Sequence, residues 1–232
     1  MSVFYDKSIG SGVGTLSEEE SRHCFQVLRH QSGDEITILD GIGGIHTCIL
    51  KEVSKKRCEF KVLETKKELP KPFSIHLAIA PTKNMDRIEW MVEKLAEIGV
   101  DQLTFLTTKH SERRNLKLDR LEKKATSAMK QSKNAYKLQL HELTKWNDFL
   151  ESDESTIKLI AHVDKDHEYI SKRISPGNSV TILIGPEGDF SSEEVSQAID
   201  SGYQPVSLGS PTLRTETAGF MACCAVNVIN EY

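Results

Sequence analysis

The segment Val180 to Ile184 constrains the fold more than any other feature, because five consecutive residues carry apolar or β-branched side chains. A strand with one solvated face alternates apolar and polar residues, whereas a parallel strand covered by helices on both faces is apolar throughout. The run therefore predicts a central strand of a parallel sheet. After Pro72 further strand candidates alternate with helical patterns, which is typical of an α/β domain with a mainly parallel sheet.

The other elements of this region follow from periodicity and from helix-capping signals. Strands are predicted at Phe73–Ala80, Leu103–Leu106, Ile157–Val163 and Val206–Leu208. Helices are predicted around Ile88–Leu95 (closed by Gly99), at Leu116–Ser132, from the capping box Ser191–Glu194 to about Ser201, and at Arg214–Asn230.

The segment before Pro72 has a different organisation. Ser17 and Glu20 have capping-box spacing and predict a short helix to about Arg29. Short strands are expected at Glu35–Leu39, Ile45–Leu50 and Cys58–Leu63, and their spacing favours a small barrel. The charged, proline-containing stretch from Lys66 to Pro72 predicts a boundary between a domain of residues 1–70 and one of residues 73–232.

Two loops of unusual composition follow strands of the predicted parallel sheet. Ligands of such sheets bind beyond the carboxyl ends of the strands. Gly185-Pro186-Glu187-Gly188 follows the first strand, and its glycines permit a close backbone approach to a flat ligand. Leu208–Ala218 combines Gly209, Arg214 and Glu216 ahead of a helix. Taken alone, the composition of the first loop favours a tight connection without a ligand, and Arg214 with Glu216 could equally form a surface ion pair.

Charge and cysteine content limit the functional classes. The net charge is −4, yet residues 109–137 hold ten basic and only three acidic residues. A local basic segment attracts phosphate even in an acidic protein; the alternative is a solvated helix face. The five cysteines form no Cys-x-x-Cys pair, which favours free thiols in a reducing cytoplasm. No segment predicts a membrane span or a signal peptide.

Several common catalytic motifs are missing from the sequence. Gly10–Gly14 and Gly41–Gly44 do not match G-x-G-x-x-G, and neither leads from a strand into a helix. We find no Walker A lysine loop, no G-x-S-x-G elbow and no histidine pair with metal-ligand spacing. A nucleotide-binding Rossmann domain, a serine hydrolase and a metal enzyme are therefore not expected.

Six motifs in order give the chain a resemblance to the RsmE-type family of 16S ribosomal RNA uridine-N3 methyltransferases, within the SPOUT superfamily. The motifs are His23-Cys24-Phe25-Gln26-Val27-Leu28-Arg29, Lys94–Val100, Ser111-Glu112-Arg113, Gln131-Ser132, Ile184–Gly188, and Leu208-Gly209 with Leu213–Ala218. The sequence departs from the family at Asp189, where a second glycine is common, and at Pro211-Thr212, which replaces Arg-Ile.

The resemblance implies a PUA-like RNA-binding β-barrel in residues 1–70. For residues 73–232 it implies a SPOUT-type methyltransferase domain with a C-terminal trefoil knot. It further implies a cytoplasmic homodimer that uses S-adenosyl-L-methionine and no metal. The expected substrate is one uridine in the decoding region of 16S rRNA, presented by the 30S subunit. The implied cofactor-binding residues are Leu106, Ile184, Gly185, Pro186, Glu187, Gly188, Leu208, Gly209, Leu213 and Thr217. Arg29, Arg113, Arg114, Lys130 and Lys133 are expected to bind RNA.

Arg214 and Glu216 are the predicted catalytic residues. Uracil N3 becomes nucleophilic when it loses its proton, so an enzyme must stabilise a developing anion. Arg214 is expected to face the uracil oxygens, and Glu216 either orients Arg214 or accepts the N3 proton. Two alternatives stay open: a ribose 2′-O RNA methyltransferase of the same superfamily, and a PUA-type RNA-binding protein without catalytic activity.

Overall fold

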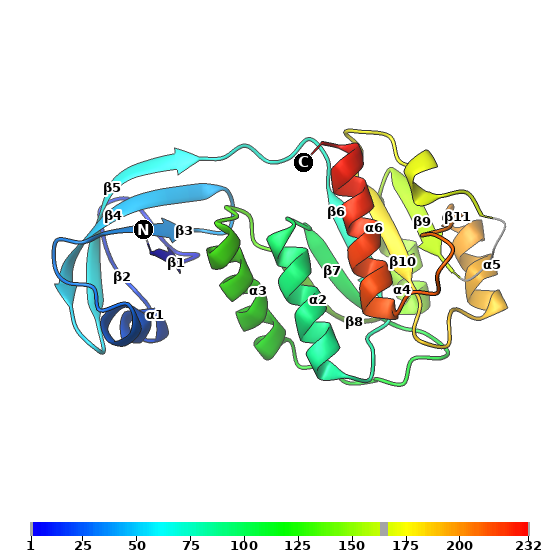
Figure 1. The fold of residues 1–232 in the computed structure, drawn as a ribbon, viewed down its shortest axis with the longest axis horizontal. Helices are drawn as coiled ribbons and strands as arrows, with labels where there is room; N and C mark the ends of the chain where they lie inside the picture. The colour runs from blue at the N-terminus through cyan, green and yellow to red at the C-terminus, as the bar shows by residue number, and fades with distance from the viewer. Residues whose placement is uncertain (1, 163–166, 232) are drawn as a thin grey trace. The chain divides into compact units, whose positions relative to one another are not determined.

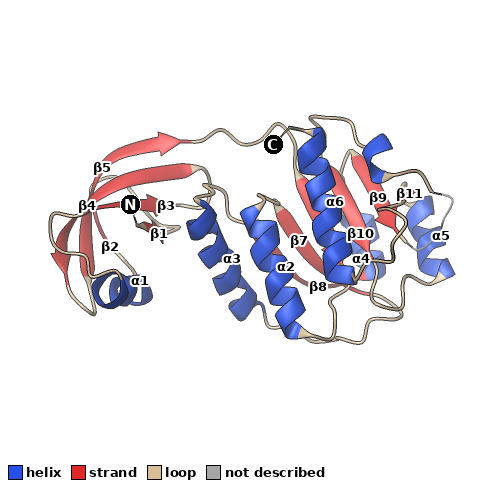
Figure 2. Ribbon diagram, viewed as in Figure 1, coloured by secondary structure: helices blue, strands red, loops and turns tan. Residues whose placement is uncertain are grey.

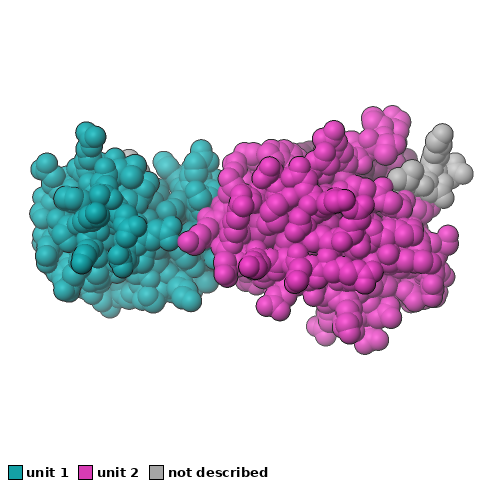
Figure 3. All heavy atoms as spheres, turned by 90° about the horizontal axis from the view of Figure 1, so that it is seen from below, with its two compact units in different colours: residues 1–70, 126–137 teal, residues 71–125, 138–232 magenta. Residues whose placement is uncertain are grey.

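The computed structural model describes residues 2–162 and 167–231. The chain divides into two compact units (Figure 3). Unit 1 contains Met1–Pro70 together with Thr126–Lys137, and unit 2 contains Lys71–Ala125 together with Leu138–Tyr232. Within the described ranges, every helix is too short or too polar to cross a membrane.

Unit 1 is built on a five-stranded sheet in the order β1-β3-β4-β5-β2. The strands are β1 (Val3–Tyr5), β2 (Val13–Thr15), β3 (Glu35–Leu39), β4 (Gly44–Val53) and β5 (Cys58–Lys67). β1 pairs with β3 in parallel, and the remaining pairs are antiparallel. Alternating residues such as Ile36 and Ile38 on β3 and Cys48 and Leu50 on β4 are buried and form the core, which also includes Phe4. The predicted strands in this unit are confirmed, and β1 and β2 are additional.

The helix predicted from Ser17 to Arg29 is shorter and changes type. α1 (Glu18–Arg22) begins where the Ser17 side chain accepts a hydrogen bond from the Glu20 backbone N–H at 3.2 Å. A π-helical turn follows at His23–Val27. Arg29 then has a φ of 57°. This left-handed conformation cannot continue a right-handed helix, so the helical segment ends before it.

The segment Thr126–Lys137 belongs to unit 1, although the sequence placed it in the second domain. It contains the C-terminal part of α3 (Leu118–Ser132). The Lys130 ammonium lies 2.7 Å from the Glu20 carboxylate, and the Tyr136 hydroxyl donates to the Glu68 carbonyl at 2.8 Å. These contacts join residues that are far apart in sequence, and local sequence patterns do not encode them.

Unit 2 contains a six-stranded sheet in which all neighbouring strands are parallel, as the sequence predicted. The order is β11-β9-β10-β6-β7-β8. The strands are β6 (Ile75–Ile79), β7 (Gln102–Thr107), β8 (Gln139–Lys145), β9 (Ile157–Ala161), β10 (Val180–Ile184) and β11 (Gln204–Val206). β10 lies between β9 and β6, and its five residues are all buried. Val163, the last residue of the strand predicted at Ile157–Val163, lies outside the described residues.

Helices cover both faces of this sheet (Figures 1 and 2). α2 (Met85–Glu97) and α6 (Thr215–Ile229) lie side by side on one face. Gly219 lets α6 approach β6 closely, because a Cβ there would come within 2.9 Å of Ile79 Cδ1. α4 (Trp146–Ser152) and α5 (Ser192–Asp200) pack on the other face, and a 3₁₀ turn spans Ile170–Lys172.

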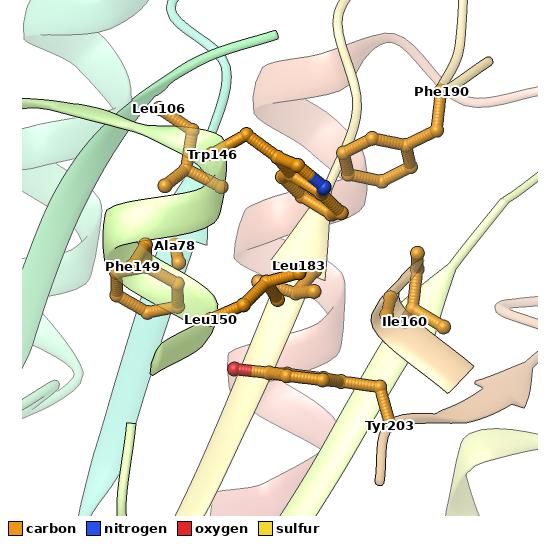
Figure 4. Close-up of a cluster of buried hydrophobic side chains, with 10 residues drawn as sticks. Ala78, Leu106, Trp146, Phe149, Leu150, Ile160, Leu183, Phe190 and Tyr203 are labelled. Atoms are coloured by element: carbon orange, nitrogen blue, oxygen red, sulfur yellow. The ribbon is translucent and has the colours of Figure 1, made fainter. Parts of the chain in front are cut away.

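The core on the α4 and α5 face is a cluster of aromatic and aliphatic side chains (Figure 4). The Trp146 and Phe190 rings lie 5.1 Å apart. Leu106 of β7 and Leu183 of β10 are fully buried in the same cluster. Trp146 donates to the Gln197 side chain at 2.9 Å, so its indole N–H is satisfied. This packing fixes the strand ends from which the predicted loops leave the sheet.

Candidate functional site

The predicted loops leave the same edge of the sheet, because parallel strands bring their carboxyl ends together. β6 ends at Ile79, β7 at Thr107, β10 at Ile184 and β11 at Val206. The site is therefore built from connections that are distant in sequence. α6 begins at Thr215 at the end of the second loop, and the first turn of a helix offers unpaired backbone N–H groups.

The loop after β10 is held tightly at its start and is open at its tip. Gly185 and Pro186 are buried, whereas Glu187 and Gly188 are exposed. A Cβ on Gly185 would lie 3.1 Å from the Phe190 backbone nitrogen, so only glycine fits without a shift. Ile184, the last residue of β10, is buried in the sheet beside it.

Asp189 closes this loop in a left-handed conformation. Its φ is 59°, and its backbone N–H donates to the Pro186 carbonyl at 2.9 Å. Residues other than glycine rarely adopt such a φ, although aspartate does so more often than most. The backbone explains why a glycine is favoured at this position and why aspartate can replace it.

The loop before α6 carries the second group of predicted residues. Gly209 has a φ of 124°, which requires a glycine. Leu208 and Leu213 are half-buried, as is Thr217 in the first turn of α6. Arg214 is the N-cap residue of α6; it is exposed, and its side chain makes no capping hydrogen bond. Its guanidinium is thus accessible from solvent.

Glu216 lies in the first turn of α6 and is buried, with 6% of its surface exposed. Its Oε1 atom lies 3.6 Å from Nε of Arg87, on α2. Oε2 is buried and has no hydrogen-bond partner in the described part of the chain. The sequence predicts a contact of Glu216 with Arg214 and does not predict Arg87, because no local sequence pattern shows that α2 packs beside α6.

Leu106 takes a different position from the other predicted cofactor residues. It lies on β7 and is completely buried. Figure 4 shows its side chain directed into the aromatic cluster, next to Trp146. Its side chain therefore serves the core, and any ligand contact at this position comes from its backbone.

Part of the basic segment is neutralised within the fold. The Arg113 guanidinium donates to the Thr82 carbonyl at 3.1 Å and to the Lys83 carbonyl. Lys130 pairs with Glu20. Two further pairs join α3 to α2: Arg120 with Glu89, and Lys124 with Glu93. Charge counting alone overestimates the positive surface.

The remaining predicted RNA contacts are exposed. Arg114 lies in the connection between β7 and α3 in unit 2. Arg29 and Lys133 belong to unit 1, and both have a φ of 57° at the ends of helical segments. These three side chains remain candidates for phosphate contacts.

A separate hollow of about 460 Å³ lies at the opposite, amino-terminal edge of the same sheet. Its polar lining includes His76, Gln102, Thr104, His141 and Asp153. The His76 ring bonds to the Thr104 hydroxyl at 2.7 Å, and the His141 ring to the Gln102 side chain at 3.1 Å. Sequence patterns gave no signal for this hollow.

The titratable groups of the hollow are shifted by their surroundings. The pKa of His76 is lowered to about 4, chiefly by burial and in smaller part by His141, against the opposing effect of Asp153. Burial alone would raise the pKa of Asp153. Hydrogen bonds from Tyr203, Ser155 and Thr181 outweigh burial and leave that pKa below its ordinary value. Among the described residues, no three His, Cys, Asp or Glu side chains are arranged to hold a metal ion.

Comparisons with known proteins agree on one kind of protein. Residues 69–227 match the family described as RNA methyltransferase domain, and residues 16–63 match the RNA methyltransferase PUA domain. The Aquifex aeolicus ribosomal RNA small subunit methyltransferase E is 28% identical over 227 residues, covering 94% of this chain and 95% of that protein.

Solved structures give the same result. A probable rRNA-methyltransferase from Porphyromonas gingivalis has a TM-score of 0.93 and 39% identity, covering 100% of this chain and 99% of that chain. Ribosomal RNA small subunit methyltransferase E from Neisseria gonorrhoeae, bound to S-adenosyl methionine, has a TM-score of 0.89 and 28% identity. That match covers 99% of this chain and 98% of the other.

Proposed function

Because the chain belongs to the RsmE family of ribosomal RNA methyltransferases, we propose that it methylates N3 of one uridine in the decoding region of 16S rRNA. It is an S-adenosylmethionine-dependent rRNA methyltransferase with a PUA domain and a SPOUT-type α/β domain. The observation that carries the proposal is that one sheet edge holds both an exposed arginine, Arg214, and a buried carboxylate oxygen, Oε2 of Glu216, that has no hydrogen-bond partner among the described residues.

The residues at this edge fit the cofactor. Gly185 keeps the start of the loop close to Phe190, since a Cβ there would lie 3.1 Å from the Phe190 backbone nitrogen, and the tip of the loop, Glu187 and Gly188, stays exposed to a ligand. Oε2 of Glu216 is a buried acceptor without a hydrogen-bond partner in residues 2–162 and 167–231. Buried polar atoms are normally hydrogen-bonded, so an unsatisfied one beside a loop indicates a place for a ligand donor.

We assign cofactor binding to the two loops and the strand ends that carry them. Ile184, Gly185, Pro186, Glu187 and Gly188 would form one side, and Leu208, Gly209, Leu213 and Thr217 the other, with a backbone contact from Leu106. When bound, S-adenosylmethionine supplies an electrophilic methyl group on a sulfonium centre.

The protein's own residues would make uracil N3 a nucleophile. Arg214 is exposed at the start of α6 and is free to contact the two carbonyl oxygens that flank N3. A guanidinium presents several donors in a fixed plane, which suits the charge that develops as the N3 proton leaves. Arg214 is therefore assigned the stabilisation of the uracil anion.

Glu216 is assigned the role of proton acceptor for uracil N3. Arg87 contacts Oε1, which leaves Oε2 as the free acceptor. The N3 proton would pass to Oε2, directly or through one water, and later to solvent.

RNA binding is assigned to both units. Unit 1 contributes Arg29, within the PUA domain, and Lys133, and unit 2 contributes Arg114. Lys130 and Arg113 were also expected to bind RNA, but their charged groups are already bonded within the fold. We therefore give these two a structural role, and place the protein in the cytoplasm, where 30S subunits are assembled.

The proposed homodimer would use the outer face of α2 and α6. Trp90 is 41% exposed, Met221 44% and Val228 74%, and the Trp90 ring packs edge-on against Phe220. Exposed apolar groups gathered on neighbouring helices mark an interaction surface. A trefoil knot of the loops around β10 is part of the same proposal.

Methyl transfer to 30S particles and to free 16S rRNA tests the function, with the modified nucleoside identified by mass spectrometry. We expect 3-methyluridine, formed preferentially on 30S particles. A 2′-O-methyl nucleoside would assign the enzyme to ribose chemistry instead. Loss of all transfer, with no cofactor binding in calorimetry, would leave an RNA-binding protein without activity.

A further inference from the structure

The turn Thr108–Arg113, between β7 and α3, is a compact unit of its own. The Thr108 N–H donates to the Ser111 hydroxyl at 2.9 Å, and the Ser111 N–H donates to the Thr108 carbonyl at 3.1 Å. Thr108 and Ser111 are buried, whereas His110 is exposed at the tip. A turn closed by its own side chains keeps the residues at its tip in a fixed position.

His110 contacts the loop after β10. Its Nδ1 atom lies 3.2 Å from the Gly188 carbonyl oxygen and 3.0 Å from the Asp189 carbonyl oxygen. Both partners are acceptors, so Nδ1 must carry the proton. The ring also lies against Gly188, since a Cβ there would be 3.7 Å from the His110 Cγ and 3.8 Å from Nδ1.

A second connection joins the same turn to the end of the loop. The Lys109 backbone N–H donates to Oε1 of Glu194 at 2.7 Å. Oε2 of Glu194 accepts from the Ser191 backbone N–H at 2.8 Å, which completes the capping box of α5. Glu194 is buried, so this connection is shielded from water.

The turn is also fixed on its other side. Arg113 donates to the carbonyls of Thr82 and Lys83, which follow β6. The Thr108–Arg113 turn thus links the connections after β6 and β10 through hydrogen bonds to their backbones. Bonds of this kind hold a strained loop in one conformation, here the loop closed by Asp189 with its φ of 59°.

We propose that His110 is a positioning residue that pre-orders the Gly185–Asp189 loop for the cofactor. The proposal rests on the proposed function of that loop. The contacts of His110 with the Gly188 and Asp189 carbonyls hold the loop in the conformation that binds the cofactor. The cofactor therefore does not have to order the loop. Pre-ordering improves binding by lowering the entropic cost of association.

Replacing the imidazole tests this role. His110→Ala should raise the Kd and the KM for S-adenosylmethionine about two- to tenfold, the range that one hydrogen bond accounts for. The kcat at saturating cofactor and the melting temperature should remain close to wild type, because His110 is exposed and does not touch the reacting atoms in this assignment.

Two amide variants separate positioning from mere bulk. The side-chain nitrogen of Asn reaches the place of Nδ1, whereas that of Gln reaches the place of Nε2. His110→Asn should recover most of the cofactor affinity, and His110→Gln should resemble His110→Ala. Lys109→Ala is the matched control, since it removes an exposed neighbouring side chain. It keeps the backbone N–H that donates a hydrogen bond to Glu194.

Hydrogen exchange without cofactor separates this proposal from the proposed function. The Asp189 amide should exchange faster in His110→Ala than in Lys109→Ala. Unchanged exchange and unchanged Kd in His110→Ala would overturn the proposal, as would equal affinities for the Asn and Gln variants. A different outcome is also informative: the Asp189 amide exchanges faster in His110→Ala than in Lys109→Ala, but the wild-type protein does not bind S-adenosylmethionine. That result would overturn the cofactor assignment and leave the contact between His110 and the loop established.

Discussion

The two edges of the parallel sheet in unit 2 differ in how their polar groups are satisfied. At the amino-terminal edge, a hollow of about 460 Å³ is lined by histidine, hydroxyl and carboxylate groups. Asp153 there accepts from Tyr203, Ser155 and Thr181. At the carboxyl-terminal edge, Arg214 is exposed and Oε2 of Glu216 has no partner in the described chain.

The loops at the carboxyl-terminal edge also contain backbone in the left-handed region. Asp189 and Gly209, both at the carboxyl-terminal edge, have φ values of 59° and 124°. Strained backbone and unsatisfied polar atoms persist where a ligand repays them, whereas satisfied side chains stabilise a fold. The size of a hollow is therefore a weaker guide to function than the state of the groups around it.

Replacing Arg214 should produce the largest effect. Arg214→Ala is expected to lower the rate of methyl transfer about 10²- to 10³-fold, because a fixed donor to the developing anion is lost. The Kd for S-adenosylmethionine and the free energy of unfolding should change little, since the side chain is exposed and caps nothing. Single-turnover assays on 30S particles, with calorimetry, measure both.

The control for this experiment is Arg214→Lys, which keeps the charge and removes the planar donor pair. It should recover only part of the rate. A rate close to wild type in Arg214→Ala would remove the functional contrast between the two edges.

A substitution at the amino-terminal edge should change stability and leave methyl transfer intact. Burial depresses the pKa of His76 from its ordinary value of 6.5 to about 4. The unfolded chain binds the proton first as the pH falls, so this histidine's contribution is complete above pH 6.5 and is lost as the pH approaches 4. Between pH 7 and pH 5 the loss should be about 2 kcal/mol.

Urea unfolding of wild type and His76→Gln at pH 7 and pH 5 measures this contribution. Glutamine places a polar group near the position of Nε2, which contacts Thr104, and it does not titrate. The variant should therefore lose less stability on acidification than wild type. Equal losses in both proteins would show that His76 is not the group responsible, and a large fall in methyl transfer at pH 7 would show that the amino-terminal edge takes part in function.

The elements that sequence predicted well are those with local signals. β10 is an uninterrupted apolar run, and Ser191 with Glu194 forms the expected capping box in front of α5. The RsmE resemblance, inferred from six short motifs in order, is confirmed by the family matches. Such motifs locate the loops because the loops themselves are contiguous in sequence.

β8 and α4 had no comparable signal and were missed. β8 is an edge strand of mixed polar and apolar residues, Gln139 to Lys145, with no buried residue. α4 is short, and its N-cap, Lys145, makes no side-chain capping hydrogen bond. β11 was predicted at Val206–Leu208 but ends at Val206, because a three-residue strand has too little pattern to fix its register.

The contacts that define the site were also beyond sequence reasoning. Arg87 reaches Glu216 and His110 reaches Gly188 across more than 70 intervening residues. Arg113 and Lys130 look like phosphate ligands in a charge count, and only the fold reveals the carbonyls and the carboxylate that they bind. Motifs predict which segments form the site, and packing decides which side chains remain available.

Two glycines of the same loop give the smallest expected effect and a test within the carboxyl-terminal edge itself. Gly185→Ala should lower the free energy of unfolding by about 1 kcal/mol, because the new Cβ would meet the Phe190 backbone nitrogen at 3.1 Å. Gly188→Ala should leave the free energy of unfolding within about 0.5 kcal/mol of wild type, since its Cβ would make an ordinary contact with His110 at 3.4 Å.

Urea denaturation without cofactor compares the two glycine variants. Equal destabilisation would mean that the tip of the loop is packed as tightly as its start. A stable Gly188→Ala protein with weakened S-adenosylmethionine binding would place the ligand against the exposed tip.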